Sequence, residues 1–328
     1  MNALLSILNA VGDPSRLRLL SVLQRAELTV SELTEIVGQS QPRVSRHLKV
    51  LCEAGLLERF KEGSWVFYRI AESGRPADFL KAVLSLDFED DVLAADRHRF
   101  DAVRRNHAAK AAQFFKANAQ DWERIRSLHA PEKDVETAIF RAVGAGPVGA
   151  FLDAGTGTGR ILELCAPHIK RGIGIDVSPE MLAIARDRLE RIGATHCQVR
   201  LADIYRMPFR TATQETGFDT ALFHQVLHYL DDPQQAVAEV ARVLRPGGRL
   251  IIGDFAQHDL EFLRTELAHR RLGFSDREVE SWFAAAHLNL VATEAIAPAE
   301  GRPSAGNGKL TVKIWLATRT AAAVQVAA

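Results

Sequence analysis

The chain has few cysteines, no long apolar run and no excess of either charge. Cys52, Cys165 and Cys197 lie far apart and none belongs to a CxxC pair, which argues against a zinc ribbon or a disulfide framework. No apolar run approaches the roughly 18 residues of a membrane span, so no membrane partner is expected. The net formal charge is +0, so a nucleic-acid site must come from a local patch.

A secretory signal is also missing, because the first residues contain neither a basic start nor a small-residue cleavage site. The 328 residues exceed one typical domain of about 100–200 residues. Hydrophobic residues make up 47% of the chain and charged residues 25%, which favours folded domains over disorder. We therefore expect a cytoplasmic protein with two main domains.

Residues 1–75 have the pattern of a winged helix-turn-helix. Asp13 is a typical N-cap and Pro14 suits the first helical position, so an amphipathic helix begins there. Further short helices follow, the last of them over 41–54. Two strand-like runs are then joined by a turn at Glu62–Ser64, which predicts the hairpin called the wing.

The helix predicted over 41–54 has an apolar face and a basic face. At 100° per residue, Val44, Leu48 and Leu51 share the stripe that faces the core. Basic residues lie outside this stripe, and arginine can bond guanine in a major groove. An ordinary solvated helix face would look the same, but the surrounding layout favours double-stranded DNA as the partner. The candidate DNA contacts are Gln41, Arg43, Ser45, Arg46 and Lys49 on the helix, with Lys61 and Arg69 on the wing.

The stretch SQPRVSRHLKVLCEAGLLERFKEGSWVFYRI resembles the ArsR/SmtB family of winged-helix repressors, and the resemblance covers about 13–70. It implies a homodimer built from the first helix and the helix after the wing. It also implies that the 41–54 helix enters the major groove. Two such helices predict an operator that is an inverted repeat.

Many members of that family sense metals, but their ligands are not matched here. The position of the family's CxC site falls in SELTEIVGQ, which has no cysteine. Asp96 and His98 match half of another site, whereas the residue eleven positions beyond His98 is Ala109. His107 falls on the other face of the predicted helix. We therefore expect no metal site.

The rest of the chain divides into regions with different sequence patterns. Residues 76–148 are almost entirely helical in pattern and are expected to form a linking, dimerisation and capping region. Strand-like and helical runs alternate over 149–320, which predicts an α/β domain with a doubly wound parallel sheet. A turn-rich loop is expected at 298–308, and residues 321–328 are expected to be a frayed tail.

A glycine-rich loop follows the first strand of this domain, in the run FLDAGTGTGR. Gly155, Gly157 and Gly159 would let the backbone turn sharply and approach a ligand. The redox dinucleotide fingerprint would need a third glycine where Arg160 stands, and the GK[ST] of a phosphate loop is absent. These departures weaken the interpretations that need a bound pyrophosphate.

Three aspartates end three successive predicted strands: Asp153, Asp176 and Asp203. Asp176 lies 21 residues beyond Gly155 (176 − 155), where a carboxylate can accept both ribose hydroxyls. One strand-end aspartate usually caps a helix or is solvated. Three aspartates at the ends of successive strands, together with the glycine loop, favour a nucleoside site.

Over about 149–318 the chain resembles the class I S-adenosylmethionine-dependent methyltransferases. LDAGTGTGR is similar to their first motif, GIGIDVSPEML to the second, LAD to the end of the third strand and LRPGGRLIIGDF to the turn into the fifth. The resemblance implies a seven-stranded Rossmann-like domain that binds S-adenosyl-L-methionine or S-adenosyl-L-homocysteine.

The same resemblance implies a role for each part of the site. Asp153 and Gly155 would serve the methionine end and Asp176 the ribose. Met181 would face the adenine, and Asp203 with Ile204 would contact its edge. The candidate cofactor-binding residues are Asp153, Gly155, Thr156, Gly157, Gly159, Asp176, Val177, Met181, Asp203 and Ile204.

HQVLHYL, after the fourth strand, is similar to small-molecule methyltransferases such as those of quinone biosynthesis. Methyl transfer from a sulfonium needs alignment and exclusion of water, and a base only where the acceptor carries a proton. His224, His228 and Tyr229 are the candidate bases, although each could instead be a packing residue. Cys165 and Cys197 are the domain's only cysteines, which argues against arsenite methylation.

Two segments, 114–129 and 269–288, are expected to cover the pocket. The candidate lining residues are Phe114, Trp122, Arg126 and Phe274, whereas Phe115 and Trp282 are expected to be ordinary packing. Three functions stay open: a regulator that is also an enzyme for a small-molecule acceptor, a regulator that only senses the nucleoside, and an enzyme that uses the winged helix for dimerisation.

Overall fold

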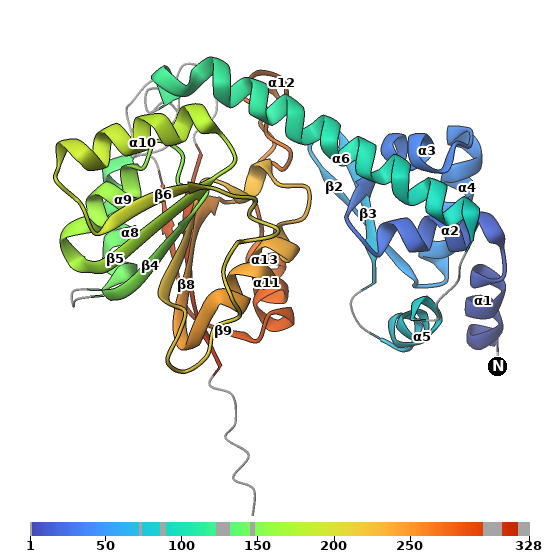
Figure 1. The fold of residues 1–328 in the computed structure, drawn as a ribbon. Coiled ribbons are helices and arrows are strands. Elements are labelled where there is room, and N and C mark those ends of the chain that lie inside the picture. The colour runs from blue at the N-terminus through green and yellow to red at the C-terminus, as the bar shows by residue number, and fades with distance from the viewer. Residues whose placement is uncertain are drawn as a thin grey trace, which may run out of the picture. The chain divides into compact units, whose positions relative to one another are not determined.

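The computed structural model describes residues 2–71, 74–85, 90–122, 132–144, 148–297 and 310–320. It divides into two compact units, Met1–Lys110 and Ala111–Ala328, whose elements are labelled in Figure 1. None of the helices in these described ranges is both long and apolar enough to cross a lipid bilayer. Arg126, the loop 298–308 and the tail 321–328 lie outside the described residues.

The first unit is a winged helix-turn-helix with a three-stranded antiparallel sheet of order β1-β3-β2. Glu62 pairs with Trp65, so the wing turn consists of two residues and Glu62 belongs to the strand. The elements are α1 (Asn2–Val11), α2 (Pro14–Leu23), β1 (Leu28–Thr29), α3 (Val30–Val37), α4 (Gln41–Glu53), β2 (Leu57–Glu62), β3 (Trp65–Ile70), α5 (Arg75–Leu84) and the first part of α6 (Asp91–Asn118).

Local sequence sets the helix ends of this unit. The Asp13 carboxylate accepts from the Arg16 amide at 3.0 Å and Pro14 is the first residue of α2, as the sequence predicts. Thr29 and Glu32 form a capping box at the start of α3, which ends at a left-handed Gly38. These caps satisfy backbone groups that the short helices would otherwise leave unbonded.

The region 76–148, predicted as a separate linking part, is shared between the two units. Leu80 of α5 and Phe100 of α6 are buried in the core of the first unit. Val135 and Ile139 of α8 (Glu132–Val143) are buried in a core of the second unit. The boundary between the units falls inside α6 because apolar residues of its first part pack against the winged helix.

The second unit contains a seven-stranded sheet of order β6-β5-β4-β7-β8-β10-β9, in which β10 alone runs antiparallel to both of its neighbours. After the end of α6, its elements are η1 (Ala119–Asp121), α8, β4 (Val148–Ala154), α9 (Arg160–Cys165), η2 (Ala166–His168), β5 (Ile169–Asp176), α10 (Pro179–Arg191), β6 (Cys197–Leu201), β7 (Phe218–His224), η3 (Leu227–Tyr229), α11 (Pro233–Val243), β8 (Leu244–Phe255), α12 (Phe262–Glu266), α13 (Asp276–Ala285), β9 (Leu288–Ile296) and β10 (Val312–Arg319).

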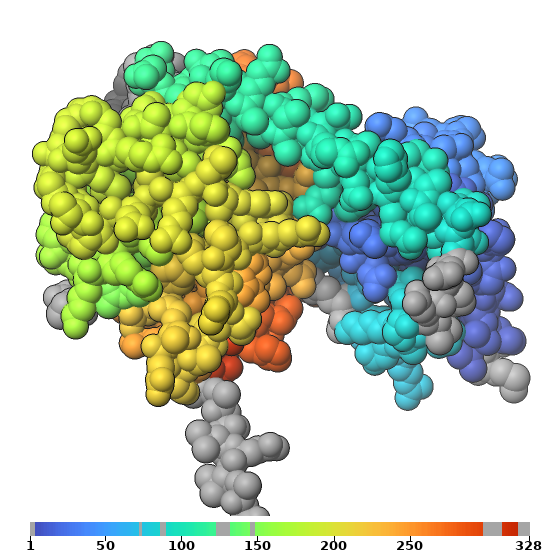
Figure 2. Space-filling view, viewed as in Figure 1, coloured from blue at the N-terminus to red at the C-terminus, as the bar shows by residue number. Residues whose placement is uncertain are grey.

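Helices cover both faces of this sheet, so it is doubly wound as predicted (Figure 1). Phe151 and Leu222 point to the face covered by α8 and α9, and Leu152 and Phe223 point to the face covered by α11 and α13. The parallel strands visible in Figure 1 are largely hidden in the space-filling view (Figure 2). The carboxyl ends of the parallel strands meet at one edge of the sheet, where ligands bind in such folds.

Candidate nucleotide site and DNA-binding face

The glycine loop after β4 is tied to the neighbouring strand. The amides of Gly155 and Thr156 donate to the carbonyl of Ile175 at 2.8 and 2.9 Å. Gly155 has a φ of 79°, and a Cβ there would lie 2.5 Å from Val226 Cγ2. Glycine is therefore required at 155 both by the backbone conformation and by the side chain that packs over it.

Asp153 and Thr156 close the inner side of this loop. The Thr156 hydroxyl donates to Asp153 Oδ2 at 2.6 Å, and both side chains are buried. Gly174 of β5 makes room for them, since a Cβ at 174 would lie 2.7 Å from Thr156 Oγ1. These contacts fix the loop from inside the sheet.

Asp176 faces the loop from the end of β5. Its Oδ2 accepts from the Gly157 amide at 2.9 Å and its Oδ1 accepts from the Ser178 amide at 2.8 Å. Burial raises the pKa of this carboxyl, and the backbone amides of Ser178, Gly157 and Val177 partly oppose that shift. The carboxylate is thereby held at the loop, at the position that the sequence assigns to the ribose.

The other predicted cofactor-binding residues differ in exposure. Val177 is 57% exposed directly after Asp176, whereas Met181 is buried in α10 and Ile204 is buried. Asp203 is exposed, and its Oδ1 accepts from the Tyr205 amide at 2.8 Å. Strand pairing brings these segments to one edge, because Asp176 is the register partner of Leu201 at the end of β6.

The candidate bases follow β7. His224 and His228 are both buried, and His228 Nδ1 lies 2.6 Å from Asp254 Oδ1. The carbonyl of His228 accepts from the amides of Arg270 and Arg271, each at 2.9 Å. His228 therefore also joins η3 to the segment after α12, which is a packing role.

Three aromatic side chains, Phe115, Trp122 and Tyr229, form what we call the ring cluster. The Phe115 ring lies 4.8 Å from the Tyr229 ring and 5.3 Å from the Trp122 ring, measured between centroids. A Cβ at Gly157 would lie 3.8 Å from Trp122 Nε1, so the cluster reaches the glycine loop. Burial, followed by the charge of Asp254, raises the pKa of the Tyr229 phenol.

One expectation about the pocket lining needs correction. Phe115 packs as expected, and the ring against it is that of the candidate base Tyr229. Phe274, expected to line the pocket, is fully buried in the core with Trp282, at a centroid distance of 5.0 Å. Phe114 lies beside Trp122 at 6.5 Å, and Trp282 packs in the core as expected.

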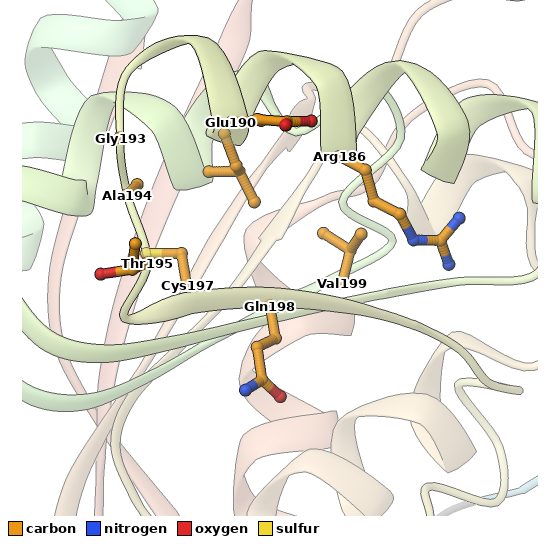
Figure 3. A pocket seen from close by; sticks show the side chains of 9 residues that line it. Arg186, Glu190, Gly193, Ala194, Thr195, Cys197, Gln198 and Val199 are labelled. Atoms are coloured by element: carbon orange, nitrogen blue, oxygen red, sulfur yellow. The ribbon is translucent and has the colours of Figure 1, made fainter.

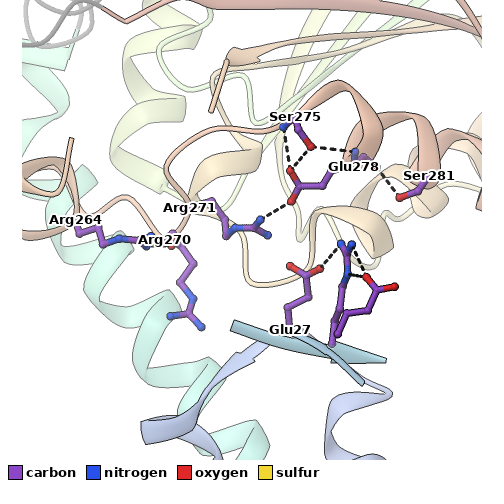
Figure 4. A network of polar contacts seen from close by, with 9 residues as sticks. Glu27, Arg264, Arg270, Arg271, Ser275, Glu278 and Ser281 are labelled. Atoms are coloured by element: carbon purple, nitrogen blue, oxygen red, sulfur yellow. Dashed lines mark hydrogen bonds and ion pairs between the residues drawn. The ribbon is translucent and has the colours of Figure 1, made fainter. Parts of the chain in front are cut away.

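The sequence also left some residues of this region unassigned. Asp254, the partner of His228, ends its strand in the same way as Asp153 and Asp176, and that pattern could have revealed it. His269 lies 4.2 Å from the His228 ring, and no sequence signal marks it. Nearby, the Arg271 guanidinium donates to Glu278 at 2.8 Å, and Glu278 completes a capping box with Ser275 (Figure 4).

A separate pocket lies between the end of α10 and the start of β6 (Figure 3). Arg186, Glu190, Cys197 and Val199 are among its lining residues. Asp176 pairs with the last residue of β6 and Cys197 is its first, so this pocket sits at the opposite end of the strands from the nucleotide site.

The predicted DNA-reading face is exposed on α4. Val44, Leu48 and Leu51 are fully buried, while Arg43, Arg46 and the other predicted helix contacts, Gln41, Ser45 and Lys49, are exposed. Lys49 lies 3.8 Å from Glu53, one turn further along the helix, and both are well exposed. Such a pair is worth little and leaves the charge accessible.

The two wing residues differ. Lys61 is exposed near the tip of the hairpin. Arg69 donates to Glu58 at 3.0 Å and lies 3.4 Å from Glu27, so its charge is balanced within the unit. The geometry favours Lys61 over Arg69 as a contact to a DNA backbone.

Asp96 and His98, which match half of a metal site of the ArsR/SmtB family, have separate surroundings in the structure. Asp96 is buried and accepts from Arg18 at 2.6 and 2.7 Å, and Arg99 also donates to it. His98 is exposed, and His107 lies 3.3 Å from Glu32. In the ranges that the structure describes, no three His, Cys, Asp or Glu side chains are grouped as a metal site.

Comparison with known families separates the same two regions. Residues 13–59 match the arsR family of bacterial regulatory proteins, and residues 152–252 match a methyltransferase domain.

Relatives among curated proteins match parts of the chain. An uncharacterized 37.1 kDa protein in transposon TN4556 of Streptomyces fradiae is 38% identical over 37% of this chain and 34% of that protein. The demethylmenaquinone methyltransferase of Tropheryma whipplei (strain Twist) is 30% identical over 47% of this chain and 62% of that protein. The matches thus span between a third and under two thirds of these relatives.

The N-methyltransferase NodS from Bradyrhizobium japonicum WM9, solved in complex with S-adenosyl-L-homocysteine, has a similar fold. It superposes with a TM-score of 0.51 and 22% identity over 64% of this chain and 98% of that chain. This chain therefore joins a helix-turn-helix segment of the bacterial ArsR regulatory family to a methyltransferase domain of the seven-stranded Rossmann-like fold.

Proposed function

We propose that the protein is a DNA-binding regulator whose methyltransferase domain binds S-adenosyl-L-methionine and methylates a small molecule. The observation that carries the proposal is the loop of Gly155 and Gly157, held against the Asp176 carboxylate at the carboxyl edge of a sheet with methyltransferase strand order. The family match over 152–252 supports the same ligand.

The residues present fit this ligand. Gly157, with a φ of 52°, offers bare backbone that a ligand can approach closely, whereas Gly159 makes room for Ala185, whose Cβ would lie 2.8 Å from a Cβ at 159. Asp176 accepts the ribose hydroxyls, and the exposed Val177 offers an apolar face to the adenine. The donor supplies an electrophilic methyl group on a sulfonium, and the protein supplies alignment and exclusion of water.

Among the candidate bases, the geometry favours His228. A carboxylate at Nδ1 holds the ring with its proton on that nitrogen, which leaves the Nε2 lone pair to take a proton from an acceptor. Tyr229 has a raised pKa and keeps its proton at neutral pH, so it acts as a hydrogen-bond donor there. His224 is buried at the end of β7.

DNA binding rests on the exposed basic face of α4. Arg43 is assigned to a base edge, and Lys49 is assigned to phosphate. A homodimer would place two such helices about 34 Å apart, in successive major grooves of an inverted repeat.

Calorimetry with S-adenosyl-L-methionine tests the ligand. Asp176→Ala removes the ribose acceptor and is expected to weaken binding by about 1.5–3 kcal/mol, as for a charge-assisted hydrogen bond. Equal affinity in the wild type and the variant would contradict the assignment. A mobility-shift series with genomic fragments tests the regulator, which fails if no fragment competes better than random DNA.

One observation favours a second candidate, a sensor that binds the nucleoside without methyl transfer. The candidate base His228 is almost fully buried, and Phe115 packs on the adjacent Tyr229. Methyl release from a labelled donor in the presence of cell extracts separates the two: transfer to an extract component establishes the enzyme. If the DNA test fails while transfer occurs, the winged helix serves dimerisation only.

A further inference from the structure

The ring cluster brings together three segments that are distant in sequence. Phe115 lies near the end of α6, Trp122 follows η1, and Tyr229 ends η3. Their planes are steeply inclined: 75° between Phe115 and Trp122, 71° between Phe115 and Tyr229, and 53° between Trp122 and Tyr229. Rings inclined in this way do not form a flat stack, so their faces point in different directions.

The ring cluster lies beside the loop that would hold the methionine end of the ligand. Trp122 reaches Gly157 on one side, and Tyr229 follows three residues after Val226, which packs over Gly155. Lys116 Nζ lies 3.5 Å from Glu180 Oε1 in the first turn of α10, close in sequence to Asp176. The end of α6 is thus held beside both halves of the nucleoside site.

The faces of aromatic rings carry partial negative charge, so they attract cations and give no such gain to a neutral group. The proposed donor carries a positive charge on sulfur before transfer, and the product left after transfer is a neutral thioether. We propose, on the basis of the function proposed above, that the ring cluster recognises this charge. The domain therefore binds S-adenosyl-L-methionine in preference to S-adenosyl-L-homocysteine.

Charge recognition of this kind gives Phe115 and Trp122 a functional role in addition to packing. For an enzyme it would speed release of the neutral product. For a sensor it would make occupancy of the site follow the ratio of methyl donor to spent donor. The same contact thus sets ligand preference under either form of the proposed function.

The experiment is calorimetry on the full chain with three ligands. S-adenosyl-L-methionine carries the charge, S-adenosyl-L-homocysteine lacks it, and sinefungin carries an ammonium in place of the sulfonium. The variants are Phe115→Leu and Trp122→Leu, which keep an apolar side chain, and Trp122→Phe, which keeps a ring. Phe140→Leu is the matched control, because Phe140 is a half-buried ring that contacts His168 at 4.7 Å, outside the cluster.

In each Leu variant, the affinity ratio of S-adenosyl-L-methionine to S-adenosyl-L-homocysteine is expected to fall by about 3- to 30-fold, and sinefungin is expected to follow the charged donor. Trp122→Phe is expected to retain part of the preference and Phe140→Leu all of it. Equal weakening of the three ligands in the Leu variants would overturn the inference while leaving the proposed function standing. A wild type that binds none of them would overturn the proposed function itself.

Discussion

The basic face of α4 and the glycine loop after β4 are both polar sites, but they are built in opposite ways. On α4, Arg43 and Lys49 extend into solvent from a helix that is anchored by fully buried leucines. In the loop, Asp153 and Asp176 are bonded to the neighbouring hydroxyl and amides. The exposed side chains of α4 contribute little to the packing of their unit, whereas the hydrogen bonds of the glycine loop help to hold the sheet together.

This difference separates stability from binding. Replacing an exposed helix residue removes a contact to a partner and leaves the unfolding free energy nearly unchanged. Replacing a loop residue disturbs hydrogen bonds and packing that hold two strands together, so folding and ligand binding change at once.

Gly155→Ala should have the largest effect. The added Cβ would meet Val226 at 2.5 Å and would also occupy a φ of 79°. The overpacking and the left-handed backbone together are expected to cost about 2–5 kcal/mol of stability in the second unit, and ligand binding is expected to be lost. Urea unfolding, followed by tryptophan fluorescence, measures the cost.

Gly193→Ala is the control for this substitution. Gly193 also has a positive φ, 66°, but no heavy atom lies within 4 Å of its Cβ position. Only the backbone cost of about 1–2 kcal/mol is expected, with normal ligand affinity. If the two variants are equally stable, the contact with Val226 does not constrain the loop.

A smaller effect is expected from acid, through His258. Burial, followed by the charge of His228, lowers the pKa of His258 to about 4. Below pH about 6.5 the unfolded chain takes up a proton that the folded chain refuses, so stability present above pH 6.5 is lost as the pH falls toward 4. The loss is expected to reach about 3 kcal/mol.

Unfolding followed between pH 7 and pH 4.5 measures this dependence. His258→Asn keeps an acceptor for the Leu260 amide, which now donates to His258 Nδ1 at 3.2 Å, but it cannot titrate. The variant should lose less stability on acidification than the wild type. Parallel pH curves for the two proteins would show that another group is responsible.

On α4, Arg43→Ala is expected to leave stability unchanged and to cost about 1–3 kcal/mol of discrimination between operator and unrelated DNA. Competition mobility shifts give the discrimination, and thermal unfolding gives the stability. A lower melting temperature in this variant would contradict the distinction drawn above, because it would mean that Arg43 stabilises the fold as well as contacting DNA.

Lys49→Ala should give the smallest change. A lysine that contacts phosphate contributes equally to all sequences, so affinity should fall uniformly and the slope of log affinity against log salt should decrease by about one unit. Binding measured across a salt series, with operator and random DNA, checks this. An effect confined to the operator would instead place Lys49 at a base.

The sequence could predict the features that short-range rules govern. Caps such as Asp13 and Thr29, and the glycine spacing of the loop, depend on neighbours within four residues, so the pattern determines them. The seven-stranded Rossmann-like domain was implied by the resemblance to the methyltransferase motifs. Periodicity alone would have given only a parallel sheet.

Long-range side-chain contacts were less accessible. Trp122 lies beside a loop 35 positions away (157 − 122). The sequence offered it as a lining residue, but the helical pattern around it could not distinguish lining from packing. Phe274, offered by the sequence as a lining residue, is buried in the core, because an aromatic residue suits either role by its pattern alone. Arg69 looks like a phosphate contact until Glu58 and Glu27 are found beside it.

The position of β10 has a consequence for how the sheet assembles. β9 precedes β10 in the chain, yet among the described strands it pairs only with β10, which in turn pairs with β8. β9 can therefore join the sheet only through β10, either after β10 has docked or together with it as an antiparallel pair. As an edge strand held by β10 alone, β9 should open readily, and hydrogen exchange is expected to find its amides less protected than those of β8 and β10.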